Sequence, residues 1–161
     1  MFSIMISYPL IFKARAVTKS GILTDWSSVA TENGQRNNTG ELECGIPTDF
    51  GGSGHGASPE DFFLLALLNC YVATFKVIAE RMKLNFETLN ASGQLNLDKE
   101  PSGQPRMKSA TLVFDLLGAS DTAKARRLMK QVSGQCMIIN SVKTAVTFDL
   151  RVDGQPEDSV Q

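Results

Sequence analysis

The stretch FFLLALLNCYVATF, residues 62–75, is the most apolar part of the chain and constrains its fold more than any other segment. Up to Val72, Asn69 is the one polar interruption, so the pattern predicts a helix that is apolar nearly all round. Such a helix must be covered on every side. Because a chain of 161 residues covers a long central helix with difficulty, we expect a second copy of the chain to contribute.

The residues SPED at 58–61 mark the start of this helix. Ser58 suits the N-cap and Pro59 the first helical position, while Glu60 and Asp61 complement the helix dipole. Ser58 and Asp61 also have the spacing of a capping box. The apolar pattern then continues to about Met82, where we expect the helix to end.

Alternating apolar residues and turn-forming clusters predict strands on both sides of this helix. The segments concerned are 13–18, 26–31 and 41–46 before the helix, and 89–97, 110–116 and 146–152 after it. The pair 89–97 and 110–116 is predicted to be antiparallel. A glycine-rich loop without a helix is expected over 47–58. A second helix is expected to begin at Ser120 or Asp121 and to end or kink at Gly134, just before Cys136.

Length and charge favour one domain over residues 1–161, with a flexible lead-in at 1–9 and a flexible tail at 153–161. The net charge of −1, with both signs spread along the chain, argues against nucleic-acid binding. Lys76 argues against a membrane span, and the apolar start lacks the positive charge that precedes a signal sequence. Three cysteines fit a reduced, cytoplasmic protein rather than a disulfide scaffold.

Two of the three cysteines lie on the predicted helices, Cys70 in the middle of the first and Cys136 at the end of the second. They are 66 residues apart, so spacing alone leaves open whether they form a pair or are two unrelated buried thiols. Cys44, on a predicted strand, is interpreted as a packing residue. With one histidine and no zinc-type cysteine spacing, we expect no metal.

The segment GGSGHGASPEDFFLLALLNCYVATF resembles the OsmC/Ohr family of thiol peroxidases. The family has a glycine-rich loop, a Pro-Glu helix start and a cysteine ten residues after the Glu, which Pro59, Glu60 and Cys70 match. CMIINSV, residues 136–142, resembles the second family motif, although Met137 replaces the usual proline. The resemblance covers roughly residues 10–152.

This resemblance implies an α+β fold of antiparallel sheets packed around two long central helices, built as an intertwined homodimer. It further implies that Cys70 is the peroxidatic thiol and Cys136 the resolving thiol. The substrate would be an organic (lipid or aryl) hydroperoxide, and a dithiol such as a lipoyl group would recycle the enzyme without a bound cofactor.

The family's activating arginine, which the motif Glu holds, has no direct counterpart here. In one branch of the family, the position of this arginine corresponds to Asp49 here. In the other branch it corresponds to the segment TKSGIL, which contains Lys19. Arg36 is a further candidate and Arg15 a poorer one. A lysine does not give the planar fork with which arginine clamps a carboxylate.

Glu60 lies ten residues before Cys70, about 15 Å along a straight helix. Either the chain bends between them or the site is completed differently, for instance across the dimer. The alternative role of Glu60 is as a partner of the helix dipole.

His55 could line the site and move protons, or be a solvated loop residue. Phe63 and Tyr71 could line a pocket, or be ordinary core residues.

Two other functions stay open: a binding protein of the same fold for a hydrophobic or thiol-bearing small molecule, and a dimeric structural protein.

Overall fold

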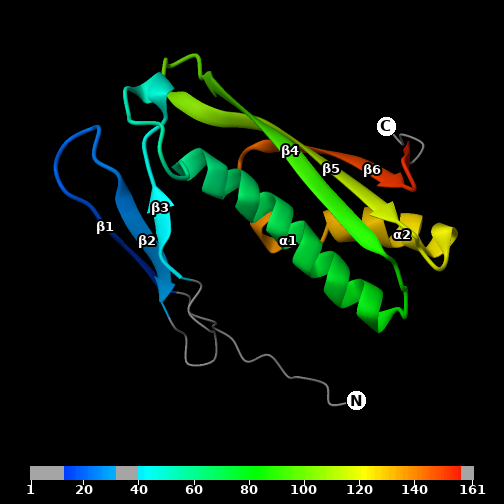
Figure 1. The fold of residues 1–161 in the computed structure, drawn as a ribbon. Helices are drawn as coiled ribbons and strands as arrows, with labels where there is room; N and C mark the ends of the chain where they lie inside the picture. Colours follow the sequence, from blue (N-terminus) through cyan, green and yellow to red (C-terminus); the bar gives the residue numbers. More distant parts are fainter. Residues whose placement is uncertain (1–12, 32–39, 157–161) are drawn as a thin grey trace. The chain divides into compact units, whose positions relative to one another are not determined.

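The computed structural model describes residues 13–31 and 40–156. The chain divides into two compact units, the first ending at Asp61 and the second beginning at Phe62. The first unit holds an antiparallel sheet of β1 (Lys13–Val17), β2 (Trp26–Thr31) and β3 (Leu42–Cys44), in that order (Figure 1). The strand predicted over 26–31 is confirmed, and the one predicted over 41–46 is shorter than expected. The predicted lead-in at 1–9 lies outside the described residues.

The glycine-rich segment after β3 folds back along that strand. Gly45 donates its backbone N–H to the carbonyl of Ala57 at 3.2 Å, and Ala57 donates to that of Glu43 at 3.0 Å. A Cβ at Gly45 would lie 1.7 Å from the His55 carbonyl oxygen, so only glycine fits there. The prediction of a loop without a helix was wrong in one detail, since Thr48–Phe50 form a single 3₁₀ turn, η1, after Pro47.

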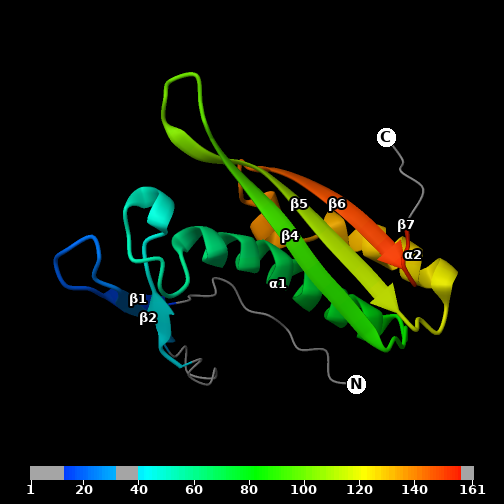
Figure 2. The same ribbon diagram turned by 45° about the horizontal axis from the view of Figure 1, so that its top comes forward.

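The second unit is built on a mixed sheet in the order β4-β5-β6-β7. Its strands are β4 (Thr88–Lys99), β5 (Pro105–Leu117), β6 (Ala145–Val152) and β7 (Gln155–Pro156). β4 and β5 pair antiparallel, as predicted. β6 pairs parallel to β5, so the prediction of purely antiparallel sheets was wrong. The reason is the helical crossover between these strands, which returns the chain to the end of the sheet where β5 began (Figure 2).

The predicted flexible tail was also partly wrong, because β7 pairs with β6. The turn that allows this pairing contains Asp153 and Gly154, both with positive φ, and the Asp153 N–H donates to the Leu116 carbonyl at 2.9 Å. Residues 157–161 lie outside the described part of the chain.

One long helix, α1 (Pro59–Arg81), is present in the described chain. Its predicted cap is confirmed: the Asp61 N–H donates to the Ser58 hydroxyl at 3.1 Å, and the Ser58 N–H donates to the Asp61 carboxylate at 2.9 Å. The second helix, α2 (Thr122–Ser133), has 12 residues and Asp121 as its N-cap. Of the two long central helices expected, the described chain therefore supplies one, because α2 stops before Gly134 and a separate turn, α3 (Met137–Asn140), follows.

The core of the second unit lies between the helices and one face of the sheet (Figure 2). α1 buries the face formed by Leu67, Tyr71, Phe75 and Ala79, and α2 buries the stripe predicted from its sequence. The facing residues of β5 are Ala110, Leu112, Phe114 and Leu116, all fully buried. Tyr71 stacks on Phe114 with ring centroids 3.7 Å apart.

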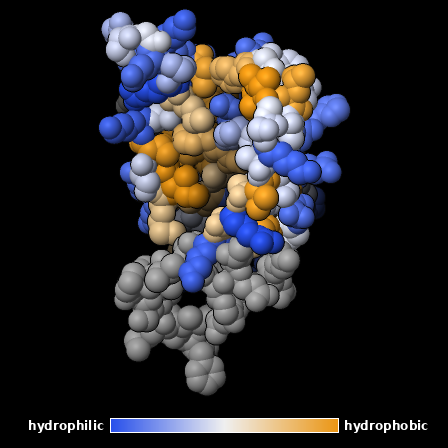
Figure 3. Space-filling view, turned by 90° about the vertical axis from the view of Figure 1, so that its left-hand side faces the viewer, coloured by the Kyte–Doolittle hydropathy of each residue, from blue (hydrophilic) through white to orange (hydrophobic). Residues whose placement is uncertain are grey.

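Some apolar residues of α1 outside this buried face remain exposed among the described residues. Leu65 and Val77 are 48% and 49% exposed, and Figure 3 shows open apolar surface on one face of the molecule. By length and composition alone α1 could cross a membrane. Its packing against β5 is that of a core helix, which passes the same test.

Candidate active site

Cys70 and Cys136 meet in the second unit although 66 residues separate them in the sequence. Cys70 is half-buried on α1, one position before the buried Tyr71. Cys136 is fully buried as the N-cap of α3. The two side chains lie close enough for Cys70 to raise the pKa of the Cys136 thiol, and both residues are free thiols. The arrangement therefore brings together two sulfur atoms that can exchange electrons.

The end of α2 places Cys136. The helix stops at Ser133 with Gly134 as its C-cap, as predicted, and the chain then enters α3, of which Cys136 is the N-cap. The Asn140 N–H closes this turn on the Cys136 carbonyl at 3.0 Å. The Asn140 side chain donates to the Gly134 carbonyl at 3.1 Å. Met137, at the usual proline position, is 73% exposed.

A buried hydrogen bond fixes α2 against α1 beside the thiols. The Tyr71 hydroxyl donates to the Met129 carbonyl at 2.9 Å. One turn further along α2, the Val132 carbonyl accepts the Cys136 thiol proton at a distance of 3.4 Å. Tyr71, the residue next to Cys70, therefore holds α2 in place, and the last turn of α2 accepts the hydrogen bond from Cys136.

The surroundings of Cys136 keep its thiol protonated. Burial, followed by the negative charge and hydrogen bonding of Cys70, raises the pKa of the Cys136 thiol to about 12, although a hydrogen bond from Thr74 acts to lower this pKa. At neutral pH, Cys136 is therefore a thiol and a proton donor.

Thr74 joins the site although no sequence motif pointed to it. It lies four residues after Cys70, and therefore on the same face of α1. Its hydroxyl donates to the Cys70 carbonyl at 2.8 Å. The signal that could have identified it is this spacing of a hydroxyl from the candidate nucleophile.

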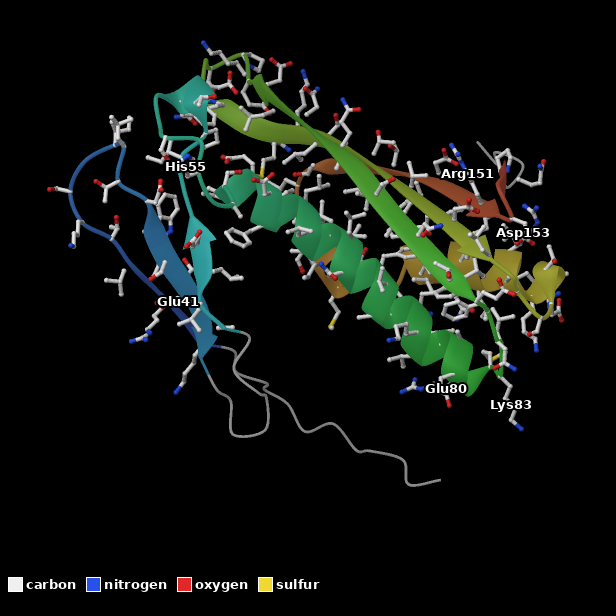
Figure 4. All side chains as sticks on the ribbon, viewed as in Figure 1. Glu41, His55, Glu80, Lys83, Arg151 and Asp153 are labelled. Atoms are coloured by element: carbon white, nitrogen blue, oxygen red, sulfur yellow. The ribbon has the colours of Figure 1, made fainter. Side chains whose placement is uncertain are left out.

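Two of the predicted site residues, Lys19 and His55, line one hollow of about 900 Å³ in the first unit. Asp25, Trp26 and Glu43 contribute to the same hollow. His55 Nδ1 lies 3.8 Å from Asp25 Oδ2, and the His55 side chain is 83% exposed on the loop after β3 (Figure 4). This exposure fits the solvated-loop interpretation of His55.

Glu60 lies in the first turn of α1, as predicted. Its Oε2 atom is buried and has no hydrogen-bond partner among the described residues. A buried carboxylate oxygen in this state is costly, so it calls for a donor. Arg36 lies outside the described residues, and Arg15 on β1 is exposed.

The remaining candidates pack in the hydrophobic interior of their own units. Tyr71 is fully buried and stacks with Phe75 and Phe114. Phe63 is partly buried against the same cluster. Cys44 is buried in the first unit, where its thiol donates to the Leu42 carbonyl at 3.4 Å. Within residues 13–31 and 40–156, no three His, Cys, Asp or Glu side chains gather to hold a metal ion.

Comparison with known sequences points to one family. A family model described as OsmC-like protein matches residues 52–151. The uncharacterized protein YmaD of Bacillus subtilis (strain 168) is 30% identical over 129 residues, which cover 73% of this chain and 85% of that protein.

Solved structures share the fold at low sequence identity. An OsmC-like protein from Mycoplasma pneumoniae matches with a TM-score of 0.72 and 12% identity, covering 90% of this chain and 99% of that chain. The organic hydroperoxide resistance protein OhrB of Bacillus subtilis matches with a TM-score of 0.60 and 19% identity, covering 88% and 98%.

The raised pKa of Cys136 predicts how slowly this residue is alkylated. At pH 8, iodoacetamide should modify Cys136 in the native protein at least about tenfold more slowly than in urea, because the thiolate is the reacting form. Peptide mapping by mass spectrometry measures both rates. The native rate should rise with pH toward pH 12. A native rate equal to that in urea at pH 8 would contradict this account of the site.

Proposed function

The chain belongs to the OsmC-like family, and on this premise we propose that it is a cysteine-based peroxidase that reduces organic hydroperoxides. The observation that carries the proposal is the proximity of the Cys70 and Cys136 thiols. The similarity of the fold to hydroperoxide resistance proteins supports it.

The proposed reaction uses the two thiols in sequence. The Cys70 thiolate attacks one oxygen of the hydroperoxide, the O–O bond breaks, and an alcohol leaves while Cys70 becomes a sulfenic acid. Cys136 then attacks the Cys70 sulfur, and a disulfide and water form. An external dithiol, such as a lipoyl group, returns the pair to the reduced state by thiol–disulfide exchange.

The neighbourhood of Cys70 supports an oily substrate. Cys70 is partly buried against the hydrophobic core, and its apolar neighbours in sequence on α1, Leu68 and Val72, are partly buried against the same core. Apolar surroundings favour alkyl or aryl hydroperoxides over hydrogen peroxide, because the transfer of an alkyl or aryl group from water to an apolar site is favourable in free energy.

We assign the activating charge to a cation held by Glu60. Reactive thiolates need a positive neighbour. Among the described residues, the buried Oε2 atom of Glu60 has no hydrogen-bond partner, so it is a ready acceptor for a cation. Lys19 and Arg36 are the candidates. The lysine at 19 also favours a second function, a binding protein for a hydrophobic or thiol-bearing molecule with little turnover, because Lys lacks the bidentate grip of Arg.

We further propose that the protein works as a cytoplasmic homodimer. The uncovered residues of α1, such as Leu65, leave apolar surface that a second copy would bury. Three free thiols suit a reducing compartment.

The proposed reaction predicts a specific product. One equivalent of an aryl hydroperoxide should convert the reduced protein to a Cys70–Cys136 disulfide, detected by intact mass and peptide mapping. Cys136→Ser should stop at a Cys70 sulfenic acid or over-oxidise to the sulfinic acid, whereas the control Cys44→Ser should behave as the natural chain. Protein that stays reduced after prolonged exposure would favour the binding function instead.

The proposed dimer predicts that Leu65→Glu shifts the protein toward monomer, because a charge in a buried interface is strongly unfavourable. Sedimentation velocity at several concentrations measures the shift. Gln131→Glu, on an exposed position of α2, is the matched control and should leave the dimer intact. A monomeric natural chain, or an unchanged dimer in Leu65→Glu, would refute this interface.

A further inference from the structure

The hollow of about 900 Å³ lies entirely in the first unit, apart from both thiols of the candidate active site. Its lining comes from the β1–β2 connection, from β3 and from the loop that carries His55. Its volume is in the range of small-molecule sites, roughly 300–1,000 Å³. The lining combines an aromatic ring, two carboxylates and an ammonium group, supplied by Trp26, Asp25, Glu43 and Lys19.

Backbone contacts hold the lining of this hollow in place. Gly56 has a φ of 70°, and a Cβ there would lie 2.8 Å from the Cys44 backbone nitrogen, so the loop lies tightly against β3. β3 in turn pairs with β2 in a register that sets Ser27 opposite Glu43 and Trp26 opposite Cys44. The loop and both strands therefore form one connected lining.

Asp25 is held through one carboxylate oxygen, which leaves the other available to a ligand. The Ser53 hydroxyl donates to Asp25 Oδ1 at 2.5 Å, and the His55 backbone N–H donates to that hydroxyl at 3.1 Å. Asp25 Oδ2 lies 3.8 Å from His55 Nδ1, beyond the length of a hydrogen bond. The Asp25 side chain is 40% exposed, so Oδ2 can accept a hydrogen bond from a bound molecule.

Glu43 and Lys19 bring charges of opposite sign to the same hollow. In the part of the chain that the structure describes, neither side chain forms an ion pair, and both residues are exposed. Trp26 is half-buried, and an indole face attracts both apolar groups and organic cations. A molecule that pairs with all three residues must carry an ammonium group, a carboxylate and an apolar group.

We propose that this hollow binds a small zwitterion with an apolar side group, such as an aromatic amino acid. The ammonium group pairs with Glu43 and donates to Asp25 Oδ2, the carboxylate pairs with Lys19, and the apolar group packs on Trp26. This binding goes beyond the peroxidase function and uses neither Cys70 nor Cys136.

The test uses the fluorescence of Trp26, which is the single tryptophan of the chain and therefore reports on this hollow. Titration of the full-length reduced protein with L-phenylalanine should change this emission to saturation, and calorimetry should give the same dissociation constant. Phenethylamine lacks the carboxylate and 3-phenylpropanoate lacks the ammonium group. Each should bind about tenfold or more weakly than phenylalanine, the worth of one hydrogen bond to a charged group.

Two substitutions separate the charged contacts. Glu43→Gln should weaken phenylalanine binding about tenfold or more without weakening that of 3-phenylpropanoate, which has no ammonium group. Lys19→Met should weaken phenylalanine binding similarly without weakening that of phenethylamine. The matched control, Glu80→Gln on an exposed position of α1, removes the same charge in the second unit and should leave the binding of all three probes unchanged.

The outcomes decide this proposal separately from the thiol chemistry. Unchanged emission and no heat with any of the three probes overturn it. Equal affinity for the three probes, or an equal loss of all three in Glu43→Gln, overturns it too, because the charged contacts would then not select the ligand. No hydroperoxide enters the measurement. A chain that forms no Cys70–Cys136 disulfide therefore refutes the peroxidase function, while the titrations still decide what the hollow binds.

Discussion

The stacking of Tyr71 on Phe114 is the contact on which the second unit depends. It joins the buried face of α1 to the centre of β5, and the Tyr71 hydroxyl extends the contact to the Met129 carbonyl of α2. One side chain therefore fixes a strand and two helices. Its neighbour Cys70 and the end of α2 are held in the same place, so the meeting of the two thiols follows from core packing. Losing this tyrosine would disturb the fold and the thiol pair together.

Much of the fold could be predicted because local rules decide it. Ser58 and Asp61 satisfy each other's backbone within three residues, so the start of α1 was visible in the sequence. Alternation likewise located β4 and β5. The parallel pairing of β6 could not be seen this way, because it depends on the path of the α2–α3 crossover. The turn α3 was also missed, since four residues carry too little periodicity to be recognised.

The two candidate thiols could be named from the sequence, but their proximity could not be predicted from it. The motif around Cys70 and the similar motif at Cys136 identified the thiols, whereas their contact depends on tertiary packing across 66 residues. Thr74 escaped notice because a hydroxyl inside an apolar helix is usually an isolated polar residue bonded to its own backbone. The cation for Glu60 is not decided by sequence, because Lys19 and Arg36 carry equal charge and the fold determines which of them reaches Glu60.

The proposed chemistry requires the two thiols to lie face to face in the native protein. Diamide oxidation tests this most directly, because the reagent joins nearby thiols whatever the natural substrate is. The reduced native protein should yield an intramolecular Cys70–Cys136 disulfide, mapped by mass spectrometry, with Cys44 left reduced. Oxidation that produces only disulfides between chains, or that links Cys44 to either thiol, would contradict the pairing of Cys70 with Cys136.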